Sequence, residues 1–167
     1  ALFLSNGSPR LGMRQNNGGS SSYVYVQNNV VGQPLVVRLT SSDASVATVP
    51  DSVIIPVGTY YAYFNVTAHD VVGTVQIQAT ATGYSPTTVN QEVTAPRFVV
   101  TTASTVRTTQ GLQAVTVYAT DAAGTAHPTN EAVVVNLASS STATGTVDSS
   151  SVTIPAGASQ VSTAQIG

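Results

Sequence analysis

The sequence has 167 residues, a charged fraction of 7% and a net charge of −2, and all 5 of its basic residues are arginine. So few basic residues offer no positively charged surface for nucleic acid or anionic lipid. The absence of cysteine excludes disulfides, thiolate metal sites and a cysteine nucleophile, and no apolar run approaches the roughly 20 residues of a membrane-spanning helix. Solubility that rests on Ser, Thr, Asn, Gln and Gly rather than on charge favours an extracellular or packed structural protein over a cytosolic enzyme.

The first half of the chain predicts short strands separated by turns. In the predicted strands, apolar and polar residues alternate with a period of two, and Gly, Pro and Asn lie between them. No stretch sustains a 3.6-residue period, so we expect no helix of consequence. Residues 10–22 are rich in Gly, Asn, Gln and Ser and are predicted to be a loop. About seven strands in roughly 95 residues are typical of a β-sandwich; they are expected at residues 2–4, 23–26, 34–39, 53–55, 60–66, 73–81 and 89–93.

The pattern restarts after Pro96, which indicates a second domain. Residues 53–59 (VIIPVGT) recur as 152–158 (VTIPAGA), and a repeat of roughly one hundred residues corresponds to one sandwich. We therefore predict two domains, residues 1–95 and 96–167. The second reaches Gly167 before the counterparts of the last two strands, so we expect it to be incomplete in this sequence, with those strands lying outside it or supplied by a neighbouring molecule.

Three segments carry a resemblance to a known family. Residues 53–59, 120–124 (TDAAG) and 152–158 resemble bacterial immunoglobulin-like (Big-type) tandem repeat domains of extracellular and surface proteins. The resemblance implies an all-β fold of two tandem immunoglobulin-like β-sandwiches and an extracellular or cell-surface location. Such domains occur in adhesins, stalks, filaments and accessory modules of enzymes, so the resemblance implies a fold rather than one activity.

No constellation of residues predicts catalysis or metal binding. His69 and His127 fall in separate predicted domains near strand ends, so they suit neither a hydrolase triad nor a shared metal site, and we interpret them as solvated loop residues. Calcium requires clustered carboxylates, which the spacing of the aspartates does not supply. We expect no enzymatic activity, no cofactor and no metal. The aspartates considered are Asp43, Asp51, Asp70, Asp121 and Asp148.

Two triplets fit the sequon for N-linked glycosylation. They are Asn6-Gly7-Ser8 and Asn65-Val66-Thr67, which makes Asn6 and Asn65 candidate acceptors. Asn65 continues an alternating strand with its side chain on the outer side.

Four tyrosines are the strongest candidates for an interaction surface. Tyr23 and Tyr25 alternate with inward valines, and Tyr61 and Tyr63 alternate with Ala62 and Phe64. In an immunoglobulin-type sandwich the second and fifth strands are neighbours, which would gather the four rings into one outward patch. The alternative is ordinary cross-strand packing. The second domain has other residues in the comparable places, which favours an interface: Thr116, Tyr118, Gln160 and Ser162.

Two functions therefore follow from the sequence. The first is a non-catalytic structural module of an extracellular surface protein or filament, whose sandwiches make homotypic contacts or pack against neighbouring subunits. The alternative is an adhesin or carbohydrate-binding module that uses the same tyrosines to contact glycans. Nucleic acid is not an expected partner of either.

Overall fold

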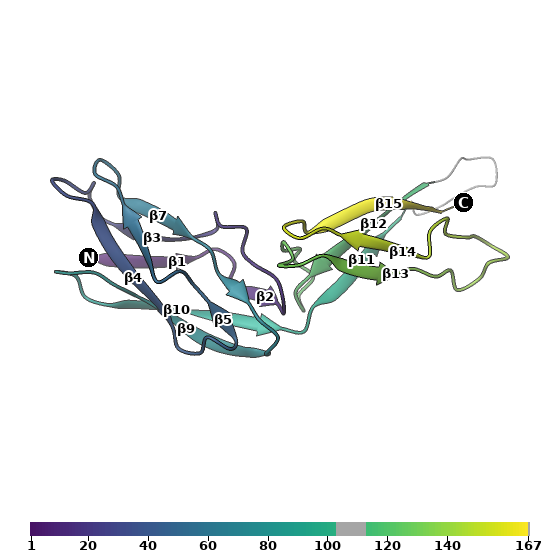
Figure 1. The fold of residues 1–167 in the computed structure, drawn as a ribbon, viewed down its shortest axis with the longest axis horizontal. Coiled ribbons are helices and arrows are strands. Elements are labelled where there is room, and N and C mark those ends of the chain that lie inside the picture. The colour runs from purple at the N-terminus through teal and green to yellow at the C-terminus, as the bar shows by residue number, and fades with distance from the viewer. Residues whose placement is uncertain (103–112, 167) are drawn as a thin grey trace. The chain divides into compact units, whose positions relative to one another are not determined.

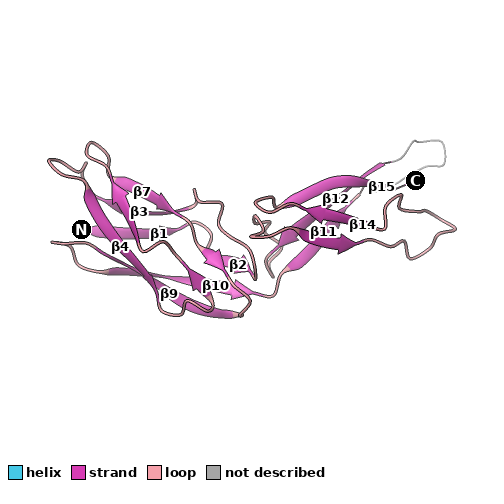
Figure 2. Cartoon of the chain, in the orientation of Figure 1, coloured by secondary structure: helices cyan, strands magenta, loops and turns pink. Residues whose placement is uncertain are grey.

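The chain folds as β-strands joined by turns. The computed structural model describes residues 1–102 and 113–166, and every regular element in them is a strand, as Figure 2 shows. The fold is all-β, as predicted. It forms two compact units, Ala1–Ala95 (unit 1) and Pro96–Gly167 (unit 2). Among the residues described, no helix is long and apolar enough to cross a membrane.

Unit 1 is built from two main sheets. One has the strand order β1-β3-β7, and the other has the order β2-β10-β9-β4-β6 (Figure 1). A small third sheet pairs β5 with β8. All pairings are antiparallel except that of β2 with β10. The strands are β1 (Leu2–Asn6), β2 (Arg10–Gly12), β3 (Ser22–Val26), β4 (Leu35–Ser41), β5 (Ala47–Thr48), β6 (Ser52–Ile55), β7 (Tyr61–Phe64), β8 (Thr67–Ala68), β9 (Gly73–Thr80) and β10 (Thr87–Thr94).

The predicted strands of unit 1 are all present, and three short ones join them. The predicted first, second and fifth strands are β1, β3 and β7, which share one sheet as in an immunoglobulin-like sandwich. β5 and β8 were not predicted. The prediction of a loop over residues 10–22 was wrong in part, because β2 lies within it. Leu11 of β2 is fully buried, and the strand runs parallel to β10 by pairing with residues more than eighty positions later in the chain.

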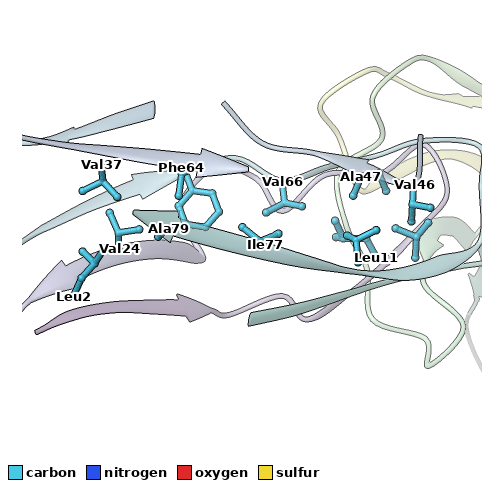
Figure 3. Packing of buried hydrophobic residues seen from close by; sticks show 14 of the residues in the cluster. Leu2, Leu11, Val24, Val37, Val46, Ala47, Phe64, Val66, Ile77 and Ala79 are labelled. Atoms are coloured by element: carbon cyan, nitrogen blue, oxygen red, sulfur yellow. The ribbon is translucent and has the colours of Figure 1, made fainter. Parts of the chain in front are cut away.

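The core of unit 1 is formed by the side chains that point inward from every second position of its strands. Val24 and Phe64 from one sheet pack with Val37, Ile77 and Ala79 from the other (Figure 3). Full burial of a Val, Ile or Phe side chain contributes about 1.5–3 kcal/mol, so this layer holds the two sheets together. The residues between the buried ones point outward, which fixes what the outer face of each sheet displays.

The described residues of unit 2 form fewer strands than those of unit 1. One sheet has the order β11-β12-β15, and β13 pairs with β14. Its buried residues include Val117, Val135 and Ile154. The pairing of β12 with β15 shifts register between Val115 and Val117, as at a β-bulge. The strands are β11 (Arg97–Thr101), β12 (Gln113–Thr120), β13 (Val133–Asn136), β14 (Ser151–Ile154) and β15 (Gln160–Ile166).

Gly7 lies where the turn after β1 meets the segment before β3. Its amide donates to the Ser21 carbonyl at 3.0 Å, and a Cβ at this position would lie 2.3 Å from that oxygen. We expect Gly7→Ala to cost about 1–3 kcal/mol, because the backbone must move apart to relieve the overlap. Gly73→Ala is the control, since its Cβ would meet only the Val46 side chain at 3.4 Å. Urea unfolding measures both, and equal stabilities for the two variants would contradict the expectation.

Candidate functional site

Pairing of β3 with β7 brings the four predicted tyrosines together. Tyr23 lies opposite Tyr63, and Tyr25 lies opposite Tyr61. Val24 lies between Tyr23 and Tyr25 in β3 and is buried in the core. Since neighbouring side chains of a strand point to opposite sides, the tyrosines lie on the outer face of the sheet. The predicted neighbourhood of the two strands is therefore observed, while its role in binding stays a prediction.

Two further aromatic residues extend this surface. Phe3 of β1 pairs with Tyr25, and the two rings stack with centroids 4.9 Å apart. Tyr60 precedes β7 and lies 5.1 Å from the ring of Tyr61. Neither residue was predicted from the sequence. Alternation along β1 could have indicated Phe3, because its neighbour Leu2 is buried and Phe3 therefore points to the outer side. The six residues Phe3, Tyr23, Tyr25, Tyr60, Tyr61 and Tyr63 are named the tyrosine face.

The rings of the tyrosine face hold one another edge to face. Centroids of Tyr23 and Tyr63 are 5.7 Å apart at an interplanar angle of 74°, and those of Tyr61 and Tyr63 are 5.3 Å apart at 79°. Such pairs contribute about 0.5–1.5 kcal/mol beyond the area they bury. Mutual packing therefore restricts the rings before any partner arrives, which lowers the entropy cost of binding.

A hollow lies among these rings. Its volume is ≈ 420 Å³, and it is lined by tyrosines alone: Tyr23, Tyr25, Tyr60, Tyr61 and Tyr63. Residues Tyr60 and Tyr63 are 48% and 49% exposed. Each phenol can donate and accept a hydrogen bond, and each ring has an apolar face. The lining contains no carboxylate, imidazole or amine, so the hollow suits stacking and hydrogen bonding rather than acid–base chemistry.

The ion pairs of unit 1 involve none of the residues of the tyrosine face. Arg10 contacts Glu92 at 2.6 Å, and Arg14 forms a two-pronged pair with Asp70, in which Arg14 Nη2 lies 3.1 Å from Asp70 Oδ2. The hydrogen bond from Arg14 holds the pKa of Asp70 below its ordinary value. The Ser45 hydroxyl and amide likewise lower the pKa of Asp43. These charges belong to loops and an exposed sheet edge.

The two histidines have structural surroundings. The expectation of a solvated loop residue was wrong for His127, which is 6% exposed, with Nε2 lying 3.4 Å from Asp121 Oδ2. Asp121 Oδ1 also accepts hydrogen bonds from the amides of Ala123 and Thr125, so Asp121 closes the turn beside His127. His69 is half-buried, and its Nε2 lies 2.9 Å from Thr48 Oγ1. Within residues 1–102 and 113–166, no group of three or more His, Cys, Asp or Glu side chains is placed to hold a metal.

The two candidate glycosylation sites differ in environment. Asn6 is half-buried, and its Nδ2 donates to the Asn90 carbonyl at 3.1 Å and to Gln91 Oε1 at 3.0 Å. Asn65 is exposed just after β7, with its Nδ2 3.5 Å from Thr67 Oγ1.

Solved structures similar to this chain include domains of surface-layer and adhesin-type proteins. Domains 5–6 of the S-layer protein SbsC are 18% identical over 100% of this chain and 83% of that chain, with a TM-score of 0.47. The D0-D1 domain of intimin is 14% identical over 98% and 83%, with a TM-score of 0.44. The Escherichia coli adhesin FdeC is 15% identical over 99% of this chain but 59% of its own, with a TM-score of 0.39. At these values the similarities carry no information on activity. No protein-family model and no curated protein sequence matches the chain.

Proposed function

We propose that this chain is a non-catalytic structural module of an extracellular surface protein or filament, and that its tyrosine face packs against another copy or a neighbouring subunit. The observation that carries the proposal is an exposed, uncharged aromatic surface on the outer face of a rigid sheet. Tyrosine is enriched in protein interfaces because one side chain supplies apolar area, a hydrogen-bonding tip and few rotatable bonds.

The composition supports contacts between copies. With a charged fraction of 7%, there is little electrostatic repulsion to keep two molecules apart. The tyrosine face lies on a sheet whose inner side is packed with Val24 and Phe64, so the surface meets a partner without first having to fold.

Self-association tests the proposal. Because an aromatic hot spot contributes about 2 kcal/mol or more, and 1.4 kcal/mol is tenfold, we expect Tyr61→Ser with Tyr63→Ser to weaken association more than about 100-fold. Sedimentation and light scattering over a concentration series measure it. The matched control is Val36→Ser with Ile54→Ser, an exposed apolar pair that faces solvent across β4 and β6 on the other sheet. A wild-type chain that stays monomeric, or equal losses in both variants, would overturn the proposal.

The second candidate is a carbohydrate-binding or adhesive module, and the tyrosine-lined hollow favours it. Pyranose rings have apolar faces that stack on aromatic rings, and phenol groups can hydrogen-bond their hydroxyls. This function predicts a protein that is monomeric throughout and loses binding to a neutral glycan array in the same double variant. This function would be excluded if self-association depended on the tyrosines and the protein bound no glycan on the array.

A further inference from the structure

We propose that Asn65 carries an N-linked glycan and that the first sugar of this glycan packs against the ring of Tyr63. The inference rests on the extracellular location in the proposed function, because the modification requires passage through a secretion route. It adds a covalent feature at one end of the tyrosine face, where the sugar takes the exposed surface of Tyr63 and leaves the other rings of that face for a protein partner.

The backbone around Asn65 is fixed by a residue far away in the chain. Asn17 Nδ2 donates to the Phe64 carbonyl at 3.3 Å, and the Val66 amide donates to Asn17 Oδ1 at 3.1 Å. Phe64 and Val66 are both buried on the inner side. Alternation then places Asn65 on the outer side, where it is exposed, so a saccharide attached to its amide meets solvent and not the core.

The Asn65 sequon is also arranged for modification. Nδ2 of Asn65 lies 3.5 Å from Thr67 Oγ1, so the acceptor amide and the hydroxyl that defines the sequon are side by side. Tyr63 precedes Asn65 by two residues, which is about 7 Å along an extended chain and on the same side of it. Tyr63 is 49% exposed, which leaves ring surface for the apolar face of the first sugar.

Asn6 supplies an internal comparison with the same sequon chemistry. Its Nδ2 donates to the Asn90 carbonyl and to Gln91 Oε1, and its Oδ1 accepts from Ser22 Oγ at 2.9 Å. A sugar on that nitrogen would remove a donor and insert a saccharide between β1 and β10. The fold therefore accommodates a glycan at Asn65 and opposes one at Asn6.

The covalent step needs a donor from outside the chain. A lipid-pyrophosphate-linked oligosaccharide is the class of co-reactant, used by a membrane-bound transferase. The bond from the sugar C1 to pyrophosphate oxygen breaks, a bond from C1 to Asn65 Nδ2 forms, the amide nitrogen loses one proton, and the lipid pyrophosphate leaves. No change of oxidation state occurs.

Mass spectrometry of the protein from its native source tests the modification. Because lysine is absent, trypsin separates the two sequons into peptides 1–10 and 39–97. We expect a mass increase by a whole oligosaccharide, confined to peptide 39–97, assigned to Asn65 by fragmentation and absent from Asn65→Gln produced in the same cells. An unmodified Asn65, or a glycan on Asn6, would overturn the inference.

The contact with Tyr63 has its own readout. In the glycosylated protein, proton signals of the first sugar should be shifted by the ring current, and these shifts should vanish in Tyr63→Ser while the glycan mass remains. A glycan without such shifts would overturn the packing on Tyr63. Both readouts are taken on the glycosylated protein, whereas association is measured on Asn65→Gln, which lacks the glycan, so failure of the glycan and failure of the assembly are distinguishable.

Discussion

Replacing Phe64 with alanine is expected to destabilise unit 1 by about 3–5 kcal/mol. Phe64 is 3% exposed and packs in the core cluster with Val24 and Ile77 (Figure 3). Truncation removes the largest aromatic side chain between the two sheets and leaves a cavity that both sheets, paired along their lengths, cannot close.

Tyrosine fluorescence during urea unfolding measures this effect. Every tyrosine except Tyr118 lies in unit 1 and the chain has no tryptophan, so the signal reports mainly on unit 1. The matched control is Tyr63→Ala, one residue earlier on the same strand, which removes two edge-to-face contacts and should cost only about 1–2 kcal/mol. If Phe64→Ala cost less than Tyr63→Ala, the assignment of inner and outer faces of β7 would be wrong.

Alternation made much of this fold predictable. In β3 and β7 the apolar residues repeat every second position, and a strand with one buried face has one register that buries them. That rule by itself assigns Tyr23, Tyr25, Tyr61 and Tyr63 to the outer side of their strands. Their meeting in one patch required only the strand order of a sandwich.

Features that depend on non-local contacts could not be predicted from the sequence. Tyr60 contacts Tyr61 and is 48% exposed, although alternation over the predicted strand 60–66 assigns it to the inner side with Ala62 and Phe64. The strand that contains Leu11, β2, forms by parallel pairing with β10, which is distant in the sequence. Burial of His127 depends on a turn closed by Asp121. Each involves a pairing that composition and spacing do not encode.

Residues 10–22 show the same limit most clearly. Their polar composition predicts a loop, yet Asn17 is only 6% exposed, and its side chain forms hydrogen bonds with the backbone on both sides of Asn65. Its backbone amide also donates to the Val66 carbonyl at 3.2 Å. The pairing of β3 with β7 ends at Phe64. Beyond that point, Asn17 supplies the hydrogen bonds that hold the backbone at Val66, so part of the polar loop packs against the chain after β7.

We therefore expect Asn17→Ala to destabilise unit 1 by about 1–3 kcal/mol, because that is the cost of a buried backbone group left without its partner. The group is the Val66 amide, whereas the Phe64 carbonyl stays opposite Ser22 in the ladder of β3 and β7. Asn29→Ala, in an exposed loop of the same unit, is the control and should change stability by less than about 0.5 kcal/mol.

Hydrogen exchange locates the effect of Asn17→Ala. The Val66 amide, which is protected when it donates to Asn17, should exchange faster in the variant than the amides of β9, whose ladder to β10 is untouched. Uniform acceleration over the whole of unit 1 would show that Asn17 acts through global stability alone. Unchanged exchange at Val66 would show that Asn17 does not hold this backbone, and the placement of Asn65 beside the tyrosine face would then need another cause.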